Sequence, residues 1–228
     1  MKRLSFVSPF VFFSLCSSAT LNASTLSIPI SRFDQQQLIG WEEKSFKGDT
    51  HYSFQKVDEV SCLKAEAQSS ASGWFIEQRI DLKHTPYLNW SWWAGNQLTG
   101  INEREKSGDD YVARVYVVID GGWKIWATKA LNYVWSSNQD TNSEWNNAFV
   151  GENAKMFALK GKEDVVGRWY DEKRNVYQDL IAFYGDQGSA EANEAAYRYI
   201  DAVALMTDTD NSEGQATACY GNLIFTAE

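Results

Sequence analysis

The chain has 228 residues, of which 44% are hydrophobic and 14% aromatic, and its formal net charge is −9. This composition excludes an intrinsically disordered chain, because disordered segments contain few aromatic residues and bury too little apolar surface. The acidic balance argues against nucleic acid and anionic membranes as partners, since both are bound through clusters of Lys and Arg. We therefore expect a globular protein without a nucleic-acid partner.

The first 23 residues have the pattern of a secretory signal peptide. Two basic residues precede an apolar run at 4–15, and the small residues Cys16-Ser-Ser-Ala19 follow it. The run is shorter than the roughly 20 apolar residues that a permanent membrane-spanning helix needs. We therefore expect cleavage after Ala19 or Ala23. The mature chain would be a periplasmic or secreted monomer with no membrane span and one domain at residues 24–228.

Cysteine usage fits an exported protein. Removal of the signal peptide leaves Cys62 and Cys219, each in a strand-like segment, in an oxidising compartment. A bridge between them closes a loop of more than half the chain, for which chain entropy alone gives on the order of 5 kcal/mol of stabilisation. We predict this disulfide, and two buried free thiols are the alternative.

Alternation of apolar and polar residues predicts β-strands over most of the chain. In residues 74–82, Trp74 and Ile76 would face the core, and Phe75 and Glu77 would face the opposite side. Further strand-like segments are 52–57, 63–67, 88–92, 111–119, 131–135, 156–159, 200–206 and 216–225. Helical spacing occurs only in residues 171–184. We predict an all-β, antiparallel β-sandwich of jelly-roll type with one covering helix.

Five ordered motifs resemble one family of exported bacterial proteins. They are Leu88-Asn-Trp-Ser-Trp92, Gly108-Asp-Asp-Tyr-Val-Ala-Arg-Val-Tyr-Val-Val118, Leu131-Asn-Tyr-Val-Trp135, Arg174-Asn-Val-Tyr-Gln-Asp179, and Ala204-Leu-Met-Thr-Asp-Thr-Asp-Asn211 followed by Tyr220-Gly-Asn-Leu-Ile-Phe225. Over about residues 38–226 the chain is similar to domain of unknown function 3047 (DUF3047). The resemblance implies an exported protein, with a strand pattern similar to galactose-binding-like and carbohydrate-binding jelly rolls. It implies no known activity. Two features depart from the family pattern: Trp93, where a basic residue is expected, and the cysteine pair.

The segment from Asp109 to Tyr116 combines groups that bind sugars. Asp109 and Asp110 precede a strand, and Arg114 and Tyr116 project from its polar face. Sugar hydroxyls need fixed donors and acceptors, and the C–H faces of sugars pack on aromatic rings. We expect these four residues to line an open groove that binds a saccharide or another polyol. The alternative is a structural ion pair between Arg114 and one of the two aspartates, which need not add net stability.

Two tryptophans, Trp93 and Trp123, are further candidates for contact with a sugar. Both lie off the apolar stripes, as Trp145 and Trp169 also do, and Trp123 follows two glycines. An exposed Trp lowers solubility unless it binds a partner, so an exposed ring at these positions would indicate a ligand contact. Tryptophans on the apolar faces are instead expected to pack in the core: Trp74, Trp90 and Trp92.

Signatures of catalysis are missing from the sequence. It contains no nucleophile elbow, no His-Glu-x-x-His, no phosphate loop and no dinucleotide fingerprint. A glycoside hydrolase or a polysaccharide lyase would need converging carboxylates, for which the candidates are Glu105, Asp109, Asp110, Glu172 and Asp179. We expect a binding protein without catalytic residues. A small enzyme of that class and a structural envelope protein without a small ligand are the alternatives.

The segment 208–214 is rich in the hard oxygen atoms that Ca²⁺ prefers. Asp208, Asp210 and Asn211 follow a predicted strand, and Ca²⁺ takes about 6–8 oxygen ligands. Glu213 stands where an EF-hand loop has an invariant glycine, so this is not an EF-hand. Asp208, Asp210 and Asn211 are therefore the candidate ligands of a structural Ca²⁺, and the sequence establishes no cofactor. The alternative is a tight turn in which Asp and Asn bond to the backbone.

Overall fold

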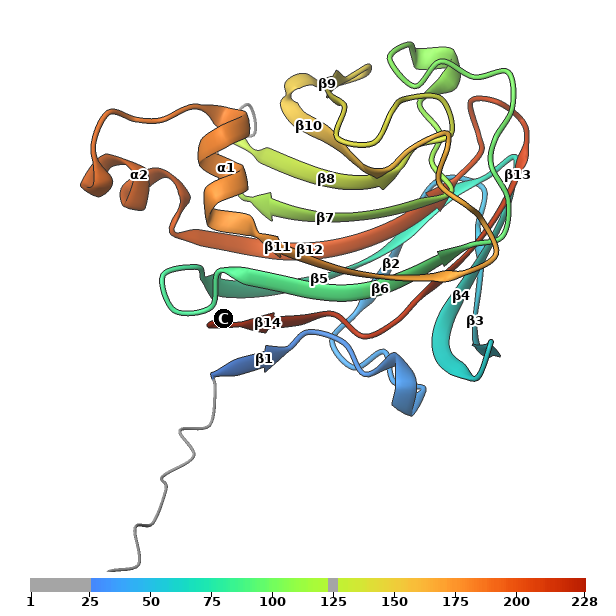
Figure 1. Ribbon diagram of the computed structural model, residues 1–228, viewed down its shortest axis with the longest axis horizontal. Coiled ribbons are helices and arrows are strands. Elements are labelled where there is room, and N and C mark those ends of the chain that lie inside the picture. The colour runs from blue at the N-terminus through green and yellow to red at the C-terminus, as the bar shows by residue number, and fades with distance from the viewer. Residues whose placement is uncertain (1–25, 123–126) are drawn as a thin grey trace, which may run out of the picture.

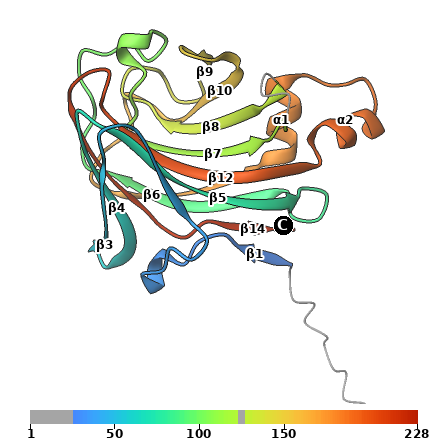
Figure 2. The ribbon, with the colours of Figure 1, turned by 180° about the vertical axis from the view of Figure 1, so that it is seen from behind.

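Two curved sheets make up most of the protein. The computed structural model describes residues 26–122 and 127–228, so the expected signal peptide and Trp123 lie outside the described residues. The two helices lie at one end of the sheets, and β3 and β4 lie at the other, as both views show (Figures 1 and 2). Within these residues, no helix has the length and apolar character needed to cross a membrane.

The first sheet, which we call sheet I, contains seven strands in the described residues. Their order is β1 (Ser27–Pro29), β14 (Ile224–Thr226), β6 (Tyr87–Ala94), β13 (Gln215–Tyr220), β4 (Val60–Gln68) and β3 (His51–Val57), with β11 (Trp169–Asn175) paired to β6. In β6, Leu88, Trp90 and Trp92 point into the core, and Asn89 and Ser91 point outward. The period-two prediction is therefore confirmed for this strand.

The second sheet, sheet II, also contains seven strands in the described ranges. Their order is β2 (Glu42–Lys47), β5 (Ala71–Asp81), β12 (Tyr199–Asp208), β7 (Ala113–Ile119), β8 (Lys129–Trp135), β10 (Gly151–Lys160) and β9 (Glu144–Asn147). Its described strand pairs are antiparallel except for β8 and β10, which are parallel. In β7, Val115 and Val117 enter the core, so Arg114 and Tyr116 project from the opposite, outer face.

Aromatic contacts between the sheets form much of the core. Trp90 of β6 lies 5.4 Å from Tyr133 of β8, and Trp92 of β6 lies 6.1 Å from Trp135 of β8, measured between ring centroids. Aromatic pairs of this kind add about 0.5–1.5 kcal/mol each beyond the burial of their area. The predicted β-sandwich is confirmed, and its core lies between the inner faces of sheets I and II.

The helical prediction was only partly correct. Residues 171–175 belong to β11, and α1 (Val176–Tyr184) begins after Asn175, whose side chain accepts a hydrogen bond from the backbone N–H of Gln178. A second helix, α2 (Ala190–Tyr197), follows an N-cap at Ser189 and was not predicted. Short 3₁₀ turns occur at Phe33–Gln35 and Lys106–Gly108. The prediction of a single covering helix is therefore corrected to two.

The predicted disulfide between Cys62 and Cys219 is present. It joins β4 to the adjacent β13, with the Cα atoms 5.7 Å apart and 157 residues between them in sequence. The alternation in both strands places the two cysteines on the outer face of sheet I, because Leu63, Ala65 and Ala218 occupy the inner face. The bridge therefore fastens two strands of one sheet rather than the two sheets to each other.

Candidate functional site

The outer face of sheet II has a hollow because its central strand carries small residues. The strand register places Phe75 of β5 and Tyr116 of β7 on either side of Ala204 of β12. In the next row, Ala202 of β12 lies between Glu77 of β5 and Val118 of β7. Adjacent strands are about 4.8 Å apart, so the two aromatic side chains arise from backbones about 10 Å apart. The alanines between them leave space for a ligand.

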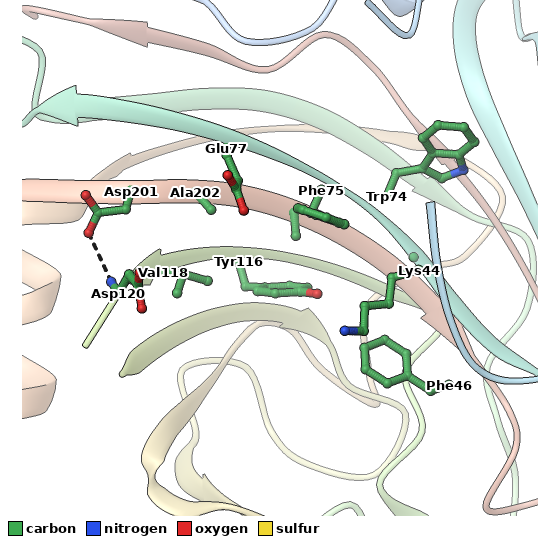
Figure 3. A pocket seen from close by; sticks show the side chains of 12 residues that line it. Lys44, Phe46, Trp74, Phe75, Glu77, Tyr116, Val118, Asp120, Asp201 and Ala202 are labelled. Atoms are coloured by element: carbon green, nitrogen blue, oxygen red, sulfur yellow. Dashed lines mark hydrogen bonds between the residues drawn. The ribbon is translucent and has the colours of Figure 1, made fainter. Parts of the chain in front are cut away.

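A first cavity of about 480 Å³ occupies this hollow. Figure 3 shows Phe75 and Tyr116 over the sheet, with Glu77 and Asp201 toward one end and Lys44 extending from β2. The backbone N–H of Asp120 donates to Oδ2 of Asp201 at 3.0 Å, which fixes the loop after β7 at the rim. The cavity is lined by Lys44, Phe46, Gly73, Trp74, Phe75, Glu77, Tyr116, Val118, Asp120, Asp201, Ala202 and Ala204.

Several polar groups in this cavity have unused bonding capacity. In the described part of the chain, the side chains of Lys44 and Glu77 make no hydrogen bond or ion pair, and the Lys44 Nζ lies 5.9 Å from the centre of the Phe46 ring. Asp201 has a charged neighbour, since Arg79 Nη1 lies 3.4 Å from its Oδ1. One ammonium and one free carboxylate can therefore bond a ligand lying on the aromatic rings.

A second cavity, of about 420 Å³, continues the first along the sheet. Tyr116 and Phe46 line both cavities. Phe149 and Val150 reach the second cavity from the turn between β9 and β10, at the opposite edge of sheet II from β2. The sheet is thus curled so that side chains from both edges flank one depression. We call the two cavities together the groove. The second is lined further by Ala71, Asp109, Arg114, Ala130, Asn132, Asn147, Ala154, Met206, Asp208, Asp210 and Asn211.

Arg114 lies on the outer face of sheet II as predicted, but the expectation that it is open to solvent is wrong. The residue is 8% exposed, and its Nη2 donates to Oδ2 of Asp208 at 2.9 Å. Its partner is Asp208, whereas the sequence suggested Asp109 or Asp110. Burial opposes the charged form of Arg114, but the Asp208 and Asp109 carboxylates outweigh it and raise the pKa of the guanidinium. Tyr116 is half-buried and lines both cavities.

Asp109 and Asp110 are buried and hold the loop that precedes β7. Asp109 accepts hydrogen bonds from the Tyr111 hydroxyl at 2.9 Å and from Nδ2 of Asn147 at 2.8 Å. Asp110 accepts from the backbone N–H groups of Asn211 at 3.1 Å and Ser212 at 2.6 Å. Burial raises the pKa of Asp109, and Arg114 opposes that rise. Asp109 also lines the second cavity, whereas Asp110 fastens the turn between β12 and β13.

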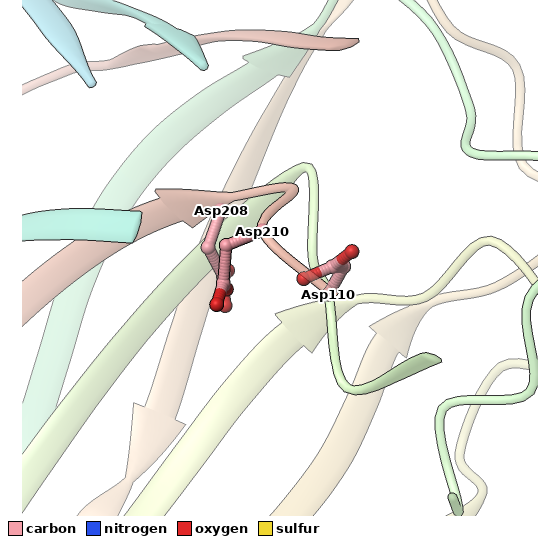
Figure 4. A group of neighbouring side chains, drawn as sticks. All are labelled: Asp110, Asp208 and Asp210. Carbon is pink, nitrogen blue, oxygen red and sulfur yellow. The ribbon is translucent and has the colours of Figure 1, made fainter. Parts of the chain in front are cut away.

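Three carboxylates gather at the end of the groove. Asp110, Asp208 and Asp210 each offer an oxygen within 4.8 Å of the others, and Figure 4 shows Asp208 and Asp210 side by side at the end of β12, facing Asp110. Burial raises the pKa of Asp208 above its ordinary value, and Arg114 opposes the rise and favours the ionised form. Asn211 directs its Nδ2 at Oδ1 of Asp110, at 3.2 Å, so it acts as a hydrogen-bond donor there. A Ca²⁺ at this position would use Asp110 in place of Asn211, and the calcium site stays a prediction.

Trp93 lies far from the groove. It belongs to β6 of sheet I, where it is paired with Cys219 of β13 and Trp169 of β11, and the alternation along β6 places it on the outer face of that sheet. The core of the sandwich separates this face from the outer face of sheet II. The structure therefore does not bring Trp93 together with Arg114 and Tyr116.

The other carboxylates considered for catalysis are held by structural partners. Glu172 accepts a hydrogen bond from Nε1 of Trp92 at 3.1 Å and lies 3.0 Å from Nζ of Lys160. Asp179 accepts from Nε of Arg174 at 2.9 Å and from the Tyr133 hydroxyl at 2.8 Å. Their partners Trp92 and Tyr133 are core residues, so Glu172 and Asp179 do not join Asp109 and Asp110. Glu105 is bonded by Asn102 in its own loop, at 2.8 Å.

Comparison with protein families identifies the chain. Residues 39–224 match the family model described as "Protein of unknown function (DUF3047)". The chain belongs to the DUF3047 family. The match confirms the resemblance carried by the five sequence motifs and extends over nearly the same residues. No curated protein sequence matches this DUF3047 protein.

Solved structures similar to this DUF3047 protein differ widely from it in sequence. A family 11 carbohydrate-binding module from Clostridium thermocellum, in complex with a β-1,3-1,4-mixed-linked tetrasaccharide, is 8% identical; the match covers 89% of this chain and 96% of the module, with a TM-score of 0.44. The xyloglucanase domain of NopAA from Sinorhizobium fredii, in complex with cellobiose, is 12% identical. That match covers 89% of this chain and 97% of the xyloglucanase domain, with a TM-score of 0.44. The glycoside hydrolase domain of Endo-D from Streptococcus pneumoniae R6 is 12% identical, with a TM-score of 0.39. That match covers 82% of this DUF3047 chain, which spans 22% of the Endo-D chain.

Sequence reasoning missed several residues of the groove in this DUF3047 protein. Phe75 and Glu77 lie on the polar face of the predicted strand at residues 74–82. Their position on that face, away from the core, is the sequence feature that could have identified them. Lys44 and Phe46 carried no such signal, because every residue of β2 is exposed and its sequence does not alternate. Only pairing of β2 with β5 brings them to the groove.

Proposed function

We propose that this DUF3047 protein is exported and binds a saccharide in the groove of sheet II without converting it. One observation carries the proposal: Tyr116 and Phe75 flank an alanine floor, beside the unpaired side chains of Lys44 and Glu77. Aromatic faces pack against sugar C–H groups, and charged or amide groups bond the hydroxyls. The groove supplies both kinds of contact.

The chemistry of the groove favours a polyhydroxylated ligand over an apolar one. Cavities of about 480 and 420 Å³ are in the size range of small-molecule sites, which is about 300–1,000 Å³. An apolar ligand would remove water from Lys44, Glu77 and Asp120 without replacing their hydrogen bonds, which is unfavourable. A sugar replaces those bonds while still covering the rings.

The absence of turnover is part of the proposal. Glycoside hydrolysis requires a carboxylic acid and a second carboxylate that flank the scissile bond. Among the carboxylates singled out for that role, Glu172 and Asp179 are bonded to core residues, and Asp110 is bonded to backbone N–H groups of a turn. These partners favour structural roles for the three acids.

A glycan array tests the proposal directly. Purified protein is expected to bind at least one class of oligosaccharide, and Tyr116→Ala is expected to weaken that binding about tenfold or more, the usual effect of losing a central aromatic contact. Ala202→Trp should abolish binding by filling the floor of the groove. The matched control is Tyr87→Ala, which removes a half-buried tyrosine from the outer face of sheet I.

Two outcomes would contradict the proposal. One is the absence of binding across neutral, acidic and amino-sugar glycans. The other is equal loss of binding in the Tyr116 and Tyr87 variants, with circular dichroism showing both folded. Release of sugar fragments from a bound polysaccharide would reject the non-catalytic part alone. Repeating the array with a calcium chelator, and again with added Ca²⁺, tests whether the predicted calcium site supports binding.

A further inference from the structure

We infer that the groove accepts a non-acidic glycan chain several sugar rings long, rather than a single sugar or an acidic polysaccharide. This inference rests on the proposed saccharide binding and specifies its ligand class. It follows from the length of the groove, from the positions of its exposed rings and from the charges that line it.

The groove extends both along β12 and across the sheet toward β8 and β10, because Ala130 and Ala154 of the second cavity lie in register with Ala202 of the first. Asp201, Ala202 and Ala204 line the first cavity, whereas Met206 and Asp208 line the second. Six residue steps of about 3.3 Å separate Ala202 from Asp208, which gives a length of roughly 20 Å along the strand. A single sugar ring covers only part of this length. A chain that runs through the groove from one cavity to the other can occupy both at once.

Exposed rings flank both cavities and suit a chain that extends through them. Phe46 is 62% exposed and Phe149 is 53% exposed, and they reach the second cavity from opposite edges of sheet II. Tyr116 lines both cavities, between the Phe75 side chain and the second cavity. These rings can stack against consecutive sugar units, which one sugar cannot contact together.

The charges of the groove disfavour an acidic ligand. Three carboxyl groups and one cationic group line the first cavity: Glu77, Asp120, Asp201 and Lys44. The second cavity has the same ratio, with Asp109, Asp208, Asp210 and Arg114. Two like charges about 4 Å apart repel by about 1 kcal/mol in water and about 4 kcal/mol near a protein surface. Arg114 is already bonded to Asp208, and Asp201 to Arg79, so among the described residues that line the groove only Lys44 is free to pair with a uronate.

The length of the ligand is tested by calorimetric titration with gluco-, xylo- and manno-oligosaccharides of one to six units. For the series that binds, affinity is expected to rise about tenfold or more between one and four units, because each added unit reaches another ring. Glu77→Ala and Asn132→Ala alter opposite cavities, and both are expected to weaken binding of the four-unit oligomer. Glu66→Ala, an exposed acid on the outer face of sheet I, is the matched control.

The charge of the ligand is tested with oligogalacturonate of the same lengths. It is expected to bind at least about fivefold more weakly than the neutral series, as repulsion of about 1 kcal/mol implies. Glu77→Gln combined with Asp120→Asn should narrow that difference, whereas Glu66→Gln should leave it unchanged. Melting temperatures identify any variant that fails to fold.

The outcomes separate this inference from the proposed function. Equal affinity for one and four units, or oligogalacturonate binding as tightly as neutral oligomers, would overturn the inference and leave saccharide binding intact. Failure of every saccharide to bind, whatever its length or charge, would overturn the proposed function itself.

Discussion

In the part of the chain that the structure describes, the outer faces of both sheets carry aromatic residues and a cavity, but only the cavities on sheet II are lined by open aromatic rings. On sheet I, Nε1 of Trp169 donates to the carbonyl of Val57 at 3.0 Å, and the Trp93 ring covers Gly95 so closely that an added Cβ would lie 2.9 Å from it. On sheet II, Phe75 and Tyr116 border the 480 Å³ cavity. An aromatic residue off the core stripe therefore indicates a binding site only where its neighbours leave space.

The space on sheet II has a specific origin in small residues. Gly73, Ala202 and Ala204 line the first cavity between larger side chains of β5 and β7. A Cβ at Gly73 would lie 2.6 Å from the carbonyl oxygen of Leu205, so the close pairing of β5 and β12 also requires glycine there. On sheet I, Trp93 and the disulfide occupy part of the outer face, and the cavity of about 410 Å³ on that face lies beside polar side chains such as Asn89, Ser91 and Lys173.

The two faces are also stabilised differently, by a covalent bond on sheet I and by a buried ion pair on sheet II. The largest expected effect is loss of the disulfide. Replacing Cys62 and Cys219 by Ala should lower the free energy of unfolding by about 4 kcal/mol, because the bridge restricts a loop of 157 residues in the unfolded chain. Urea denaturation measures this change. Saccharide affinity of the folded variant should stay unchanged, and a weakened affinity would show that the two faces are coupled.

Loss of the Arg114–Asp208 ion pair of sheet II should have the second-largest effect on the free energy of unfolding. Arg114→Met leaves Asp208 buried without its cation, and the expected loss is about 3 kcal/mol of unfolding free energy. The double variant Arg114→Met/Asp208→Asn should recover part of that loss, since it removes the stranded carboxyl. Lys56→Met is the control, because its pair with Glu59 is exposed and contributes at most about 1 kcal/mol. Equal losses in the Arg114 and Lys56 variants would contradict this account.

A smaller effect concerns pH. Burial raises the pKa of Glu103 from 4.5 to about 7, despite hydrogen bonds from Ser136 and the Ser137 N–H. Between about pH 4.5 and 7 the folded protein therefore retains a proton on Glu103 that the unfolded chain releases. The contribution of Glu103 to the free energy of unfolding is highest below about pH 4.5 and falls as the pH rises toward 7. In the Glu103→Gln variant, the fall in unfolding free energy between pH 5 and 8 should be smaller than in the wild type by on the order of 2 kcal/mol. Urea denaturation midpoints across this pH range measure the difference.

The control for the pH test is Glu59→Gln, which removes a carboxyl whose side chain is 91% exposed. A Glu59→Gln variant whose slope of stability against pH changes as much as that of Glu103→Gln would contradict this account. A wild-type protein whose stability rises steadily from pH 5 to 8 would show that Glu103 is ionised throughout that range.

The smallest expected effect is at the rim of the groove. Phe46→Ala should weaken saccharide binding by about 1 kcal/mol, or about fivefold, because this ring is exposed and contributes contact area alone. Ile39→Ala, an exposed apolar residue that does not line the groove, should have no effect. Calorimetry with the oligosaccharide found on the array measures both. Equal affinities of the two variants would remove Phe46 from the site.

The sequence predicts a strand correctly where one face of that strand is buried and the other is not. In β6 and β7 one face is buried, so alternation predicted both the strands and the directions of Trp90, Trp92, Arg114 and Tyr116. The alternation in β2 and β9 is absent or too short, because β2 is an exposed edge and β9 has four residues. In β11 the inward residues Glu172 and Arg174 are charged and satisfied by Lys160 and Asp179. That segment therefore lacks an apolar stripe with the period of a strand, and its sequence pattern predicts a helix instead.

The sequence alone determined the β-sandwich, the disulfide and the face from which Arg114 and Tyr116 project. These features depend on period-two burial and on cysteine placement, which are local or compositional properties. Tertiary structure decided that Asp208 pairs with Arg114, that Trp93 lies on the opposite sheet, and that Lys44 and Phe46 reach the groove. Each of these depends on which strands become neighbours across long stretches of chain. Such pairing is set by packing of the whole sandwich, and no short segment encodes it.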